Sequence, residues 1–219
     1  PTSVKTRVMA GHHQIVRFDY ESDADIDAEL ALEVAQRVRE LAADCDVLIV
    51  EDYNKGLLVP TVIRAVLDVC ASQGIPSVVD PKRRNFFAYG GATVFKPNAK
   101  EVADALGEFI RPDDPEWMEA TRGRIDCEHL LLTLGDRGVA LQSRREKLVR
   151  VPTMARSVFD VSGAGDTVTA VVAVALAAGG TPSEAAVLAN HAAAVGVAKA
   201  GVATVSPNEI RTHMNDTEV

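Results

Sequence analysis

The chain has 219 residues, and 47% of them are hydrophobic, which is enough to bury a substantial core and disfavours disorder. It carries 31 acidic and 23 basic residues, a net charge of −8, so we expect no binding to the phosphate backbone of nucleic acid. The N-terminus shows no signal-peptide pattern, and no apolar run is long enough to span a bilayer. We therefore expect a cytoplasmic protein with no membrane partner.

The three cysteines, Cys45, Cys70 and Cys127, are widely spaced and include no Cys-x-x-Cys pair. An odd number at this spacing predicts neither a disulfide framework nor a zinc site. We therefore expect each cysteine to be a buried thiol in a reducing compartment.

The predicted secondary structure begins with two strands within residues 6–19, joined by a turn near Gly11. Residues 26–43 place leucine and valine on one face at helical spacing, which predicts an amphipathic helix. The apolar run at 46–50 predicts a parallel strand that is buried on both faces. The elements expected beyond it are helices at 60–72, 98–106, 116–122, 165–178 and 182–200, and strands at 75–79, 93–95, 129–133, 139–142 and 147–151. The stretch 168–178 is so apolar that we expect its helix to be buried.

Strands that alternate with helices predict an α/β fold with a mostly parallel central sheet. No repeat or long linker divides residues 1–219, so a single domain is expected. In open sheets of this kind, ligands bind beyond the carboxyl ends of the strands. Three segments at such ends are candidates: Asp80-Pro81-Lys82, Lys96-Pro97-Asn98 and Thr133-Leu134-Gly135-Asp136.

The segment Asp160-Val161-Ser162-Gly163-Ala164-Gly165-Asp166-Thr167 joins a small-residue loop to an apolar helix. The first amides of a helix point outward and carry the positive end of its dipole, an arrangement that stabilises phosphate. A carboxylate at Asp166 can accept the proton of an attacking hydroxyl, which contributes roughly a hundred- to ten-thousandfold in rate. The alternative is structural, because aspartate is favoured in the first turn of any helix and the glycines can serve a tight turn alone.

Two further segments each allow a chemical and a structural interpretation. Asn98 and Glu101 lie on one face of a helix start, where their oxygens can hold magnesium through water or can form a capping box. The run 133–138 can lay backbone amides against a nucleotide or simply join two strands of a hairpin.

Other nucleotide-binding patterns are excluded. A dinucleotide fingerprint would need a glycine where the chain has Val168, and no Gly-x-x-x-x-Gly-Lys-Ser/Thr loop occurs. His-Arg-Asp and Asp-Phe-Gly are also absent, which excludes a protein kinase.

The three segments together, in this order and spacing, resemble the ribokinase-like (PfkB) family of carbohydrate kinases. The resemblance implies a three-layer α/β/α fold, ATP and Mg²⁺ as cofactors, and a sugar as phosphate acceptor. It implies that Asp166 is the general base and that the N–H groups of Gly163, Ala164 and Gly165 form an anion hole.

The same resemblance assigns the nucleotide site. It implies that Asn98 and Glu101 hold magnesium and phosphate and that Asn190 and His191 lie near the adenine. The full set of residues expected to bind ATP is Asn98, Ala99, Lys100, Glu101, Thr133, Gly135, Asn190 and His191.

Within the family, the chain is most similar to kinases of D-glycero-β-D-manno-heptose 7-phosphate, which serve the ADP-heptose pathway to lipopolysaccharide core. The residues that carry this narrower resemblance are Lys5-Thr6-Arg7-Val8, Val16-Arg17-Phe18-Asp19, Asp52-Tyr53-Asn54-Lys55-Gly56, Asp80-Pro81-Lys82-Arg83-Arg84-Asn85-Phe86 and Phe95-Lys96-Pro97-Asn98-Ala99-Lys100-Glu101. It implies phosphorylation of the anomeric hydroxyl to the 1,7-bisphosphate.

The chain departs from the family pattern at its start, where members carry a first βαβ portion that binds the sugar. We therefore expect the N-terminal strands and much of the lid to be missing, with residues 1–20 a remnant of the lid or strand region. We also expect a homodimer, or a partner chain that covers the exposed sheet edge. The alternatives are a nucleotide-binding module without catalysis, or a kinase for another sugar phosphate or a nucleoside.

Overall fold

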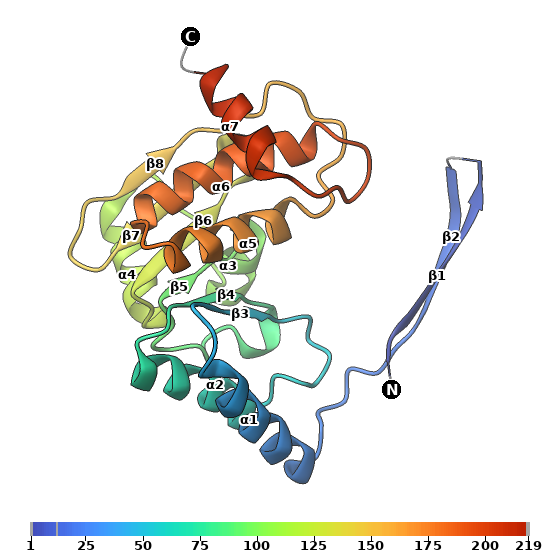
Figure 1. Cartoon of the computed structure of the whole chain (residues 1–219), viewed down its shortest axis with the longest axis vertical. Helices are drawn as coiled ribbons and strands as arrows, with labels where there is room; N and C mark the ends of the chain where they lie inside the picture. The colour runs from blue at the N-terminus through green and yellow to red at the C-terminus, as the bar shows by residue number, and fades with distance from the viewer. Residues whose placement is uncertain (1, 12, 218–219) are drawn as a thin grey trace.

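The structure is a computed structural model that describes residues 2–11 and 13–217. A six-stranded sheet in the order β3-β4-β5-β6-β7-β8 lies at its centre (Figure 1). Its strands are β3 (Leu48–Glu51), β4 (Ser77–Asp80), β5 (Val94–Phe95), β6 (His129–Thr133), β7 (Val139–Ser143) and β8 (Val149–Val151). The first four are parallel, whereas β7 and β8 run antiparallel to their neighbours. The carboxyl ends of β3 to β6 therefore meet at one edge of the sheet.

Alternating side chains of each strand enter two separate cores. Val79 and Phe95 belong to one core, and their neighbours Val78 and Val94 belong to the other. This is the period-two alternation of a strand, and adjacent positions are apolar here because helices cover both faces.

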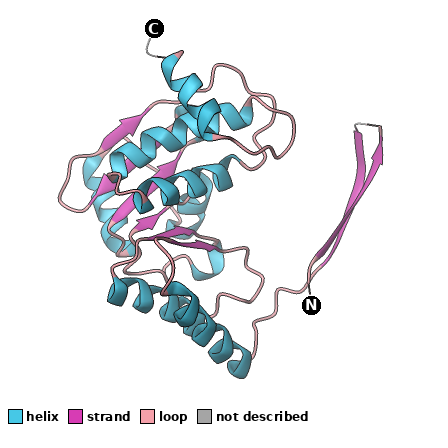
Figure 2. Ribbon diagram, in the orientation of Figure 1, coloured by secondary structure: helices cyan, strands magenta, loops and turns pink. Residues whose placement is uncertain are grey.

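Helices cover both faces of the sheet, which makes the fold a three-layer α/β/α architecture (Figure 2). On one face pack α2 (Pro60–Gln73), α3 (Ala99–Leu106) and α4 (Pro115–Ile125), and on the other α5 (Ala164–Ala177) and α6 (Pro182–Val197). The remaining helices are α1 (Ala28–Ala42), which packs on α2, α7 (Pro207–Asn215), which packs on α6, and the short turns η1 (Arg83–Asn85) and η2 (Gly135–Arg137). The predicted fold class is confirmed.

Local sequence explains where these helices begin and end. Helices α3 and α6 each begin with a capping box. The side chains of Asn98 and Thr181 accept the backbone N–H three residues later, and the side chains of Glu101 and Glu184 accept the backbone N–H of Asn98 and Thr181 in return. Gly107 ends α3 in the left-handed conformation, which costs glycine little.

A hairpin of β1 (Val4–Ala10) and β2 (His13–Tyr20) projects from the body of the molecule (Figure 1). Its base is tied down by ion pairs from Lys5 and Lys55 to Glu21. Nearly every described residue of the hairpin is exposed, and Ile15, Phe18 and Tyr20 are among the large apolar side chains left in solvent.

Four expectations need correction. The strand expected at 46–50 is not buried on both faces, because β3 is the edge strand of the described sheet and its Ile49 is 41% exposed. Cys45 is exposed because it lies in the turn after α1, although Cys70 and Cys127 are buried as predicted. Helix α5 is buried on one face only, and Val174 on its other face is 67% exposed. Helix α7 was not predicted, although the capping box of Ser206 and Glu209 is a usable signal for it. In the described part of the chain, no helix combines the length and hydropathy needed to cross a bilayer.

Candidate active site

Polar side chains converge at the edge where the parallel strands end. Glu51 and Asp80 are the last residues of β3 and β4, and Lys96 follows β5. The N-terminus of α5 lies over them, because a Cβ built on Gly165 would be 3.7 Å from Lys96 Nζ. The fold thus brings the predicted catalytic loop to the predicted strand-end motifs, as expected for a parallel sheet.

The loop before α5 is held by Asp160. Its carboxylate accepts the N–H of Ser162 at 2.9 Å and the N–H of Gly201 at 3.2 Å, and the bond from Ser162 lowers the pKa of Asp160. Gly163 adopts φ 77° as the N-cap of α5, a left-handed conformation that favours glycine. Of the predicted anion-hole amides, that of Ala164 donates to Val161 O within the turn at 3.2 Å. The anion-hole prediction therefore depends chiefly on Gly163 and Gly165.

Asp166 is exposed in the first turn of α5 and faces two other carboxylates. Carboxylate oxygens of Glu51, Asp80 and Asp166 lie within 4.8 Å of one another. Below them, Lys96 Nζ lies 2.9 Å from Asp80 Oδ2, and both residues are buried. The site is thus a compact group of three acids and one buried ammonium.

Burial and the charges of this group raise the pKa values of two residues, Glu51 and Tyr53. Burial, together with the charges of Asp80 and Asp166, raises the pKa of Glu51 to about 7, against the lowering effect of Lys96. The charge of Asp166 also raises the pKa of Tyr53, with burial as a second cause. Glu51 is therefore partly protonated at neutral pH, whereas an isolated glutamate would be ionised.

Asn98 and Glu101 form the capping box that the sequence allowed as an alternative. Asn98 Oδ1 accepts the Glu101 N–H at 2.9 Å, and Glu101 Oε2 accepts the Asn98 N–H at 2.8 Å. The second carboxylate oxygen, Glu101 Oε1, lies 2.5 Å from Lys82 Nζ, which is 3.5 Å from Asp80 Oδ1. Lys82 thus links this segment to the carboxylate group.

The other residues expected in the nucleotide segment point elsewhere. Ala99, the first residue of α3, is partly buried against the core. Lys100 is exposed and pairs with Asp104 at 2.5 Å. A role for either residue at the nucleotide stays a prediction.

The end of β6 lies directly beside Asn98. Thr133 N donates to Pro97 O at 3.0 Å, and Asn98 and Thr133 form an isolated parallel bridge. Gly135 follows in η2 with φ 62°, at the turn into β7. The structure therefore brings together two of the segments expected to bind the nucleotide.

Asn190 and His191 lie in α6 and are buried. Asn190 Nδ2 donates to Pro152 O at 2.5 Å, which ties α6 to the segment after β8. His191 Nδ1 lies 3.0 Å from Nδ1 of His213 in α7, one nitrogen donating and the other accepting. Both contacts are structural, and a role near the adenine stays a prediction.

Sequence reasoning assigned no chemical role to Glu51, Lys82 or Lys96. The motifs Asp80-Pro81-Lys82 and Lys96-Pro97-Asn98 marked the strand ends but not the charges that meet there. The signal that could have found these residues is their position at the carboxyl end of a parallel strand, where ligands bind. Glu51, at the end of β3, has the same position.

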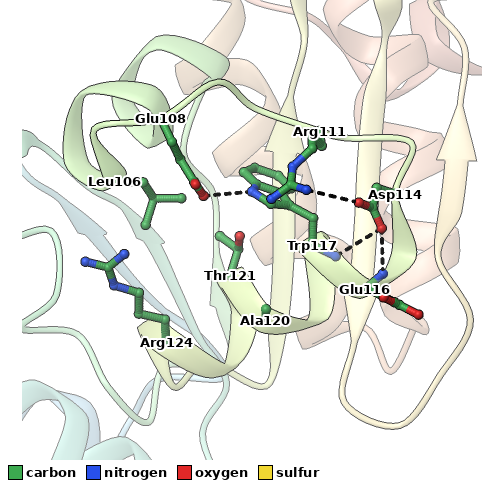
Figure 3. Close-up of a pocket in the computed structure, with 9 residues that line it drawn as sticks. All are labelled: Leu106, Glu108, Arg111, Asp114, Glu116, Trp117, Ala120, Thr121 and Arg124. Carbon is green, nitrogen blue, oxygen red and sulfur yellow. Dashed lines mark hydrogen bonds and ion pairs between the residues drawn. The ribbon is translucent and has the colours of Figure 1, made fainter.

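Of the hollows in the described structure, one adjoins this group and another lies apart from it. One of about 610 Å³ lies between the hairpin base, β3 and the α1–α2 pair, and it reaches Glu51 and Tyr53. The other, of about 350 Å³, lies between the end of α3 and α4 (Figure 3), where Trp117 Nε1 donates to Glu108 at 2.9 Å. The second hollow contains none of the predicted site residues.

Comparison with known proteins shows the family of the chain. The sequence pattern of the pfkB family carbohydrate kinases matches residues 1–209. The chain belongs to this PfkB family. Among individual PfkB relatives, it is 46% identical to the bifunctional protein HldE of Pelobacter propionicus and 43% identical to that of Geobacter metallireducens. Each alignment covers 95% of the chain but only 43% of the relative, so the chain spans less than half of their length.

Solved structures share the fold. Escherichia coli phosphofructokinase-2 in complex with potassium matches with a TM-score of 0.80 at 17% identity, over 99% of this chain and 71% of that one. Arabidopsis thaliana ribokinase, complexed with ribose and ATP, matches with a TM-score of 0.71 at 18% identity, over 97% of this chain and 68% of that one. At such identities the likeness supports the ribokinase-like architecture only.

Proposed function

We propose that this chain transfers the γ-phosphoryl group of ATP to a hydroxyl of a sugar phosphate, with Asp166 as the general base. The observation that carries the proposal is the place of Asp166, in the first turn of α5, above the buried pair of Lys96 and Asp80. Membership of the PfkB family of carbohydrate kinases supports it.

In this mechanism Asp166 accepts the proton of the sugar hydroxyl as that oxygen attacks the γ-phosphorus, while the bond from the γ-phosphorus to the bridging oxygen breaks and ADP leaves. The amides of Gly163 and Gly165, at the positive end of α5, stabilise the negative charge on the transferring group. Catalysis of this kind depends mostly on positioning and charge stabilisation, since the protein itself forms no covalent bond.

The nucleotide would lie along the ends of β5 and β6, where Asn98 and Thr133 form a bridge, and Glu101 and Gly135 follow them in the chain. Asn98 and Glu101 fit a magnesium ion held through water, because Mg²⁺ prefers oxygen ligands and retains much of its hydration shell. Their oxygens already accept protein hydrogen bonds, but each keeps a lone pair for a metal-bound water. When bound, such an ion would neutralise charge on the phosphates. Ala99, Lys100, Asn190 and His191 complete the proposed set.

The acceptor we propose is D-glycero-β-D-manno-heptose 7-phosphate, phosphorylated at its anomeric hydroxyl to the 1,7-bisphosphate. Identities of 46% and 43% to two bifunctional HldE proteins support this choice, as do the sequence segments that carry the narrower resemblance. The hollow beside Glu51 and Tyr53 adjoins the carboxylate group and is a place where a sugar can approach Asp166.

Two alternative functions predict different experimental results. A non-catalytic nucleotide-binding module would show a thermal shift with Mg-ATP and no phosphorylation of any sugar. A kinase of the same family with another acceptor would turn over another sugar phosphate or a nucleoside in a substrate panel.

The test is Asp166→Asn, with phosphoryl transfer and ATP binding measured on the same preparations. We expect the rate to fall about a hundred- to ten-thousandfold while the Mg-ATP thermal shift is retained, because only the proton acceptor is lost. Asp44→Asn is the matched control, since Asp44 is exposed in the turn after α1, and its turnover should equal that of the wild type. Turnover retained in Asp166→Asn would rule out Asp166 as the base.

A further inference from the structure

Residues 21–26 join the hairpin to α1 without forming a helix or strand. Ile26 is partly buried, and the rest of the segment is exposed. An exposed connection of this kind is ordinarily a flexible linker, because it makes few contacts with the body of a protein. The contacts of this segment show instead that it is held in place.

Gly56, in the turn after β3, makes the closest of these contacts. A Cβ built on Gly56 would lie 1.8 Å from the carbonyl oxygen of Ala24, so the two backbones touch where only glycine fits. The carbonyl oxygen of Gly56 also accepts the N–H of Ile26 at 3.0 Å. Its φ of 78° is left-handed, so both the conformation and the space at this position require glycine.

Arg84, in η1, adds hydrogen bonds to the same segment. Its Nη1 donates to the carbonyl oxygen of Asp23 at 2.9 Å and lies 2.9 Å from Asp25 Oδ1. Its backbone N–H donates to Asn54 Oδ1 at 3.3 Å, so Arg84 also contacts the turn that carries Gly56. An exposed ion pair alone contributes little to stability, but this guanidinium also binds a backbone carbonyl and so fixes the chain itself.

The turn that carries Gly56 is fixed to the core. Asp52 is 3% exposed, and its two carboxylate oxygens accept the N–H of Asn54 at 2.7 Å and the hydroxyl of Tyr89 at 2.8 Å. Tyr89 is fully buried in the core on one face of the sheet. The segment 21–26 is therefore held against a rigid surface.

The base of the hairpin forms one wall of the hollow beside the carboxylate group. Lys5 and Glu21 line this hollow from the hairpin, and Glu51 and Tyr53 line it from the end of β3 and the turn that follows. A shift of the segment 21–26 would move the first wall relative to the second. The shape of the hollow therefore depends on where this segment is held.

We propose that Gly56 and Arg84 are positioning residues for the sugar acceptor: they hold the segment 21–26 against the turn after β3 and so fix the hairpin wall of the hollow. The inference rests on the proposed function, in which the acceptor approaches Asp166 through this hollow. The role needs no contact of Gly56 or Arg84 with either substrate. A disturbed anchor should weaken acceptor binding and leave the nucleotide site unchanged.

The first test compares Arg84→Gln with Arg83→Gln, its neighbour in η1. Arg83 is exposed, and in the described part of the chain its side chain has no hydrogen bond or ion pair. Arg84→Gln should raise the KM for the heptose 7-phosphate about two- to fivefold, as expected for the loss of exposed charged contacts. Its kcat and its KM for ATP should stay unchanged, and Arg83→Gln should match the wild type in all three.

The second test compares Gly56→Ala with Gly74→Ala. Gly74 has φ 70° and no atom within 4 Å of its Cβ position, so both substitutions strain a left-handed backbone but only Gly56→Ala displaces the segment 21–26. The KM for the heptose 7-phosphate should rise about tenfold or more in Gly56→Ala, because the wall of the hollow is misplaced. It should stay at the wild-type value in Gly74→Ala.

A third readout needs no turnover. The N–H of Ile26 donates to Gly56 O, so its hydrogen exchange, followed by NMR without ATP or sugar, reports whether the segment is held. Exchange should be faster in Gly56→Ala and Arg84→Gln than in the two controls. If Gly56→Ala does not fold by circular dichroism, Arg84→Gln carries the test.

Two results would overturn the inference: wild-type exchange at Ile26 in Arg84→Gln, or faster exchange with an unchanged KM for the sugar phosphate. Failure of the proposed function looks different. The wild type then phosphorylates no sugar, which removes the role toward the acceptor, while exchange at Ile26 still decides whether Gly56 and Arg84 hold the segment.

Discussion

Glu51 has an ionisation that couples the stability of the protein to pH. Its pKa is raised from 4.5 to about 7, with burial as the largest cause and Asp80 next. A carboxyl with a raised folded-state pKa binds its proton more tightly in the folded protein than in the unfolded chain. Its contribution to stability is therefore favourable at low pH and is lost as pH rises from about 4.5 through 7.

We predict that Glu51→Gln stabilises the protein at pH 8 but not at pH 5. The neutral amide avoids the cost of a buried charge, which the wild type bears once Glu51 is ionised. A rise in Tm of about 2–4 °C at pH 8 is expected, measured by thermal denaturation at both pH values. An equal change at pH 5 and pH 8 would contradict the assignment of that charge to Glu51.

At the scale of single elements, the turn between η2 and β7 depends on Gly138. It has φ 76° and ψ −132°, and a Cβ there would lie 2.1 Å from the carbonyl oxygen of Val151. Neither the conformation nor the space allows a side chain. The antiparallel half of the sheet is therefore joined by a turn that only glycine can make.

We predict that Gly138→Ala and Gly123→Ala change stability in opposite directions. Gly123 lies within α4 with nothing near its Cβ position, so alanine should stabilise the protein by about 0.5–1 kcal/mol. Gly138→Ala should destabilise it by about 1–3 kcal/mol or more, because β7 or β8 must shift. Chemical denaturation of both variants checks the pair, and a neutral Gly138→Ala would show that the turn relaxes freely.

At the scale of the whole molecule, the projecting hairpin has one apolar face. The register pairs Val4 with Tyr20, Thr6 with Phe18 and Val8 with Val16, so these side chains lie on the same side. The opposite side carries the charged pairs Lys5–Asp19 and Arg7–Arg17. A two-stranded hairpin alone is marginally stable in water, so a partner surface on the apolar face is expected.

We predict that this face mediates self-association of the chain. Val16→Lys places a charge at the centre of this face. It should halve the mass measured by size exclusion with light scattering, from that of a dimer to that of a monomer. Arg7→Gln on the opposite side is the control and should leave the mass unchanged. A wild-type chain that is monomeric across the accessible concentration range would contradict the prediction.

Much of the fold could be predicted from local pattern. Apolar runs at 46–50 and 129–133, separated by amphipathic stretches, indicated parallel strands, and capping residues such as Asn98 located helix starts to within a residue or two. Exposure was less predictable. Cys45 and the apolar outer face of α5 were both expected to be buried, yet both are exposed, because what covers a residue depends on elements far along the chain.

The sequence by itself determined the α/β class, the parallel sheet and the candidate loop ending at Asp166, because these depend on periodicity and on short motifs. Only the tertiary structure decided that Glu51, Asp80 and Asp166 meet above a buried Lys96. These residues come from four separate segments, and their charges interact only once the parallel strands end at a common edge. The pKa of Glu51 is therefore a property of the assembled site, since burial and neighbouring charges produce it.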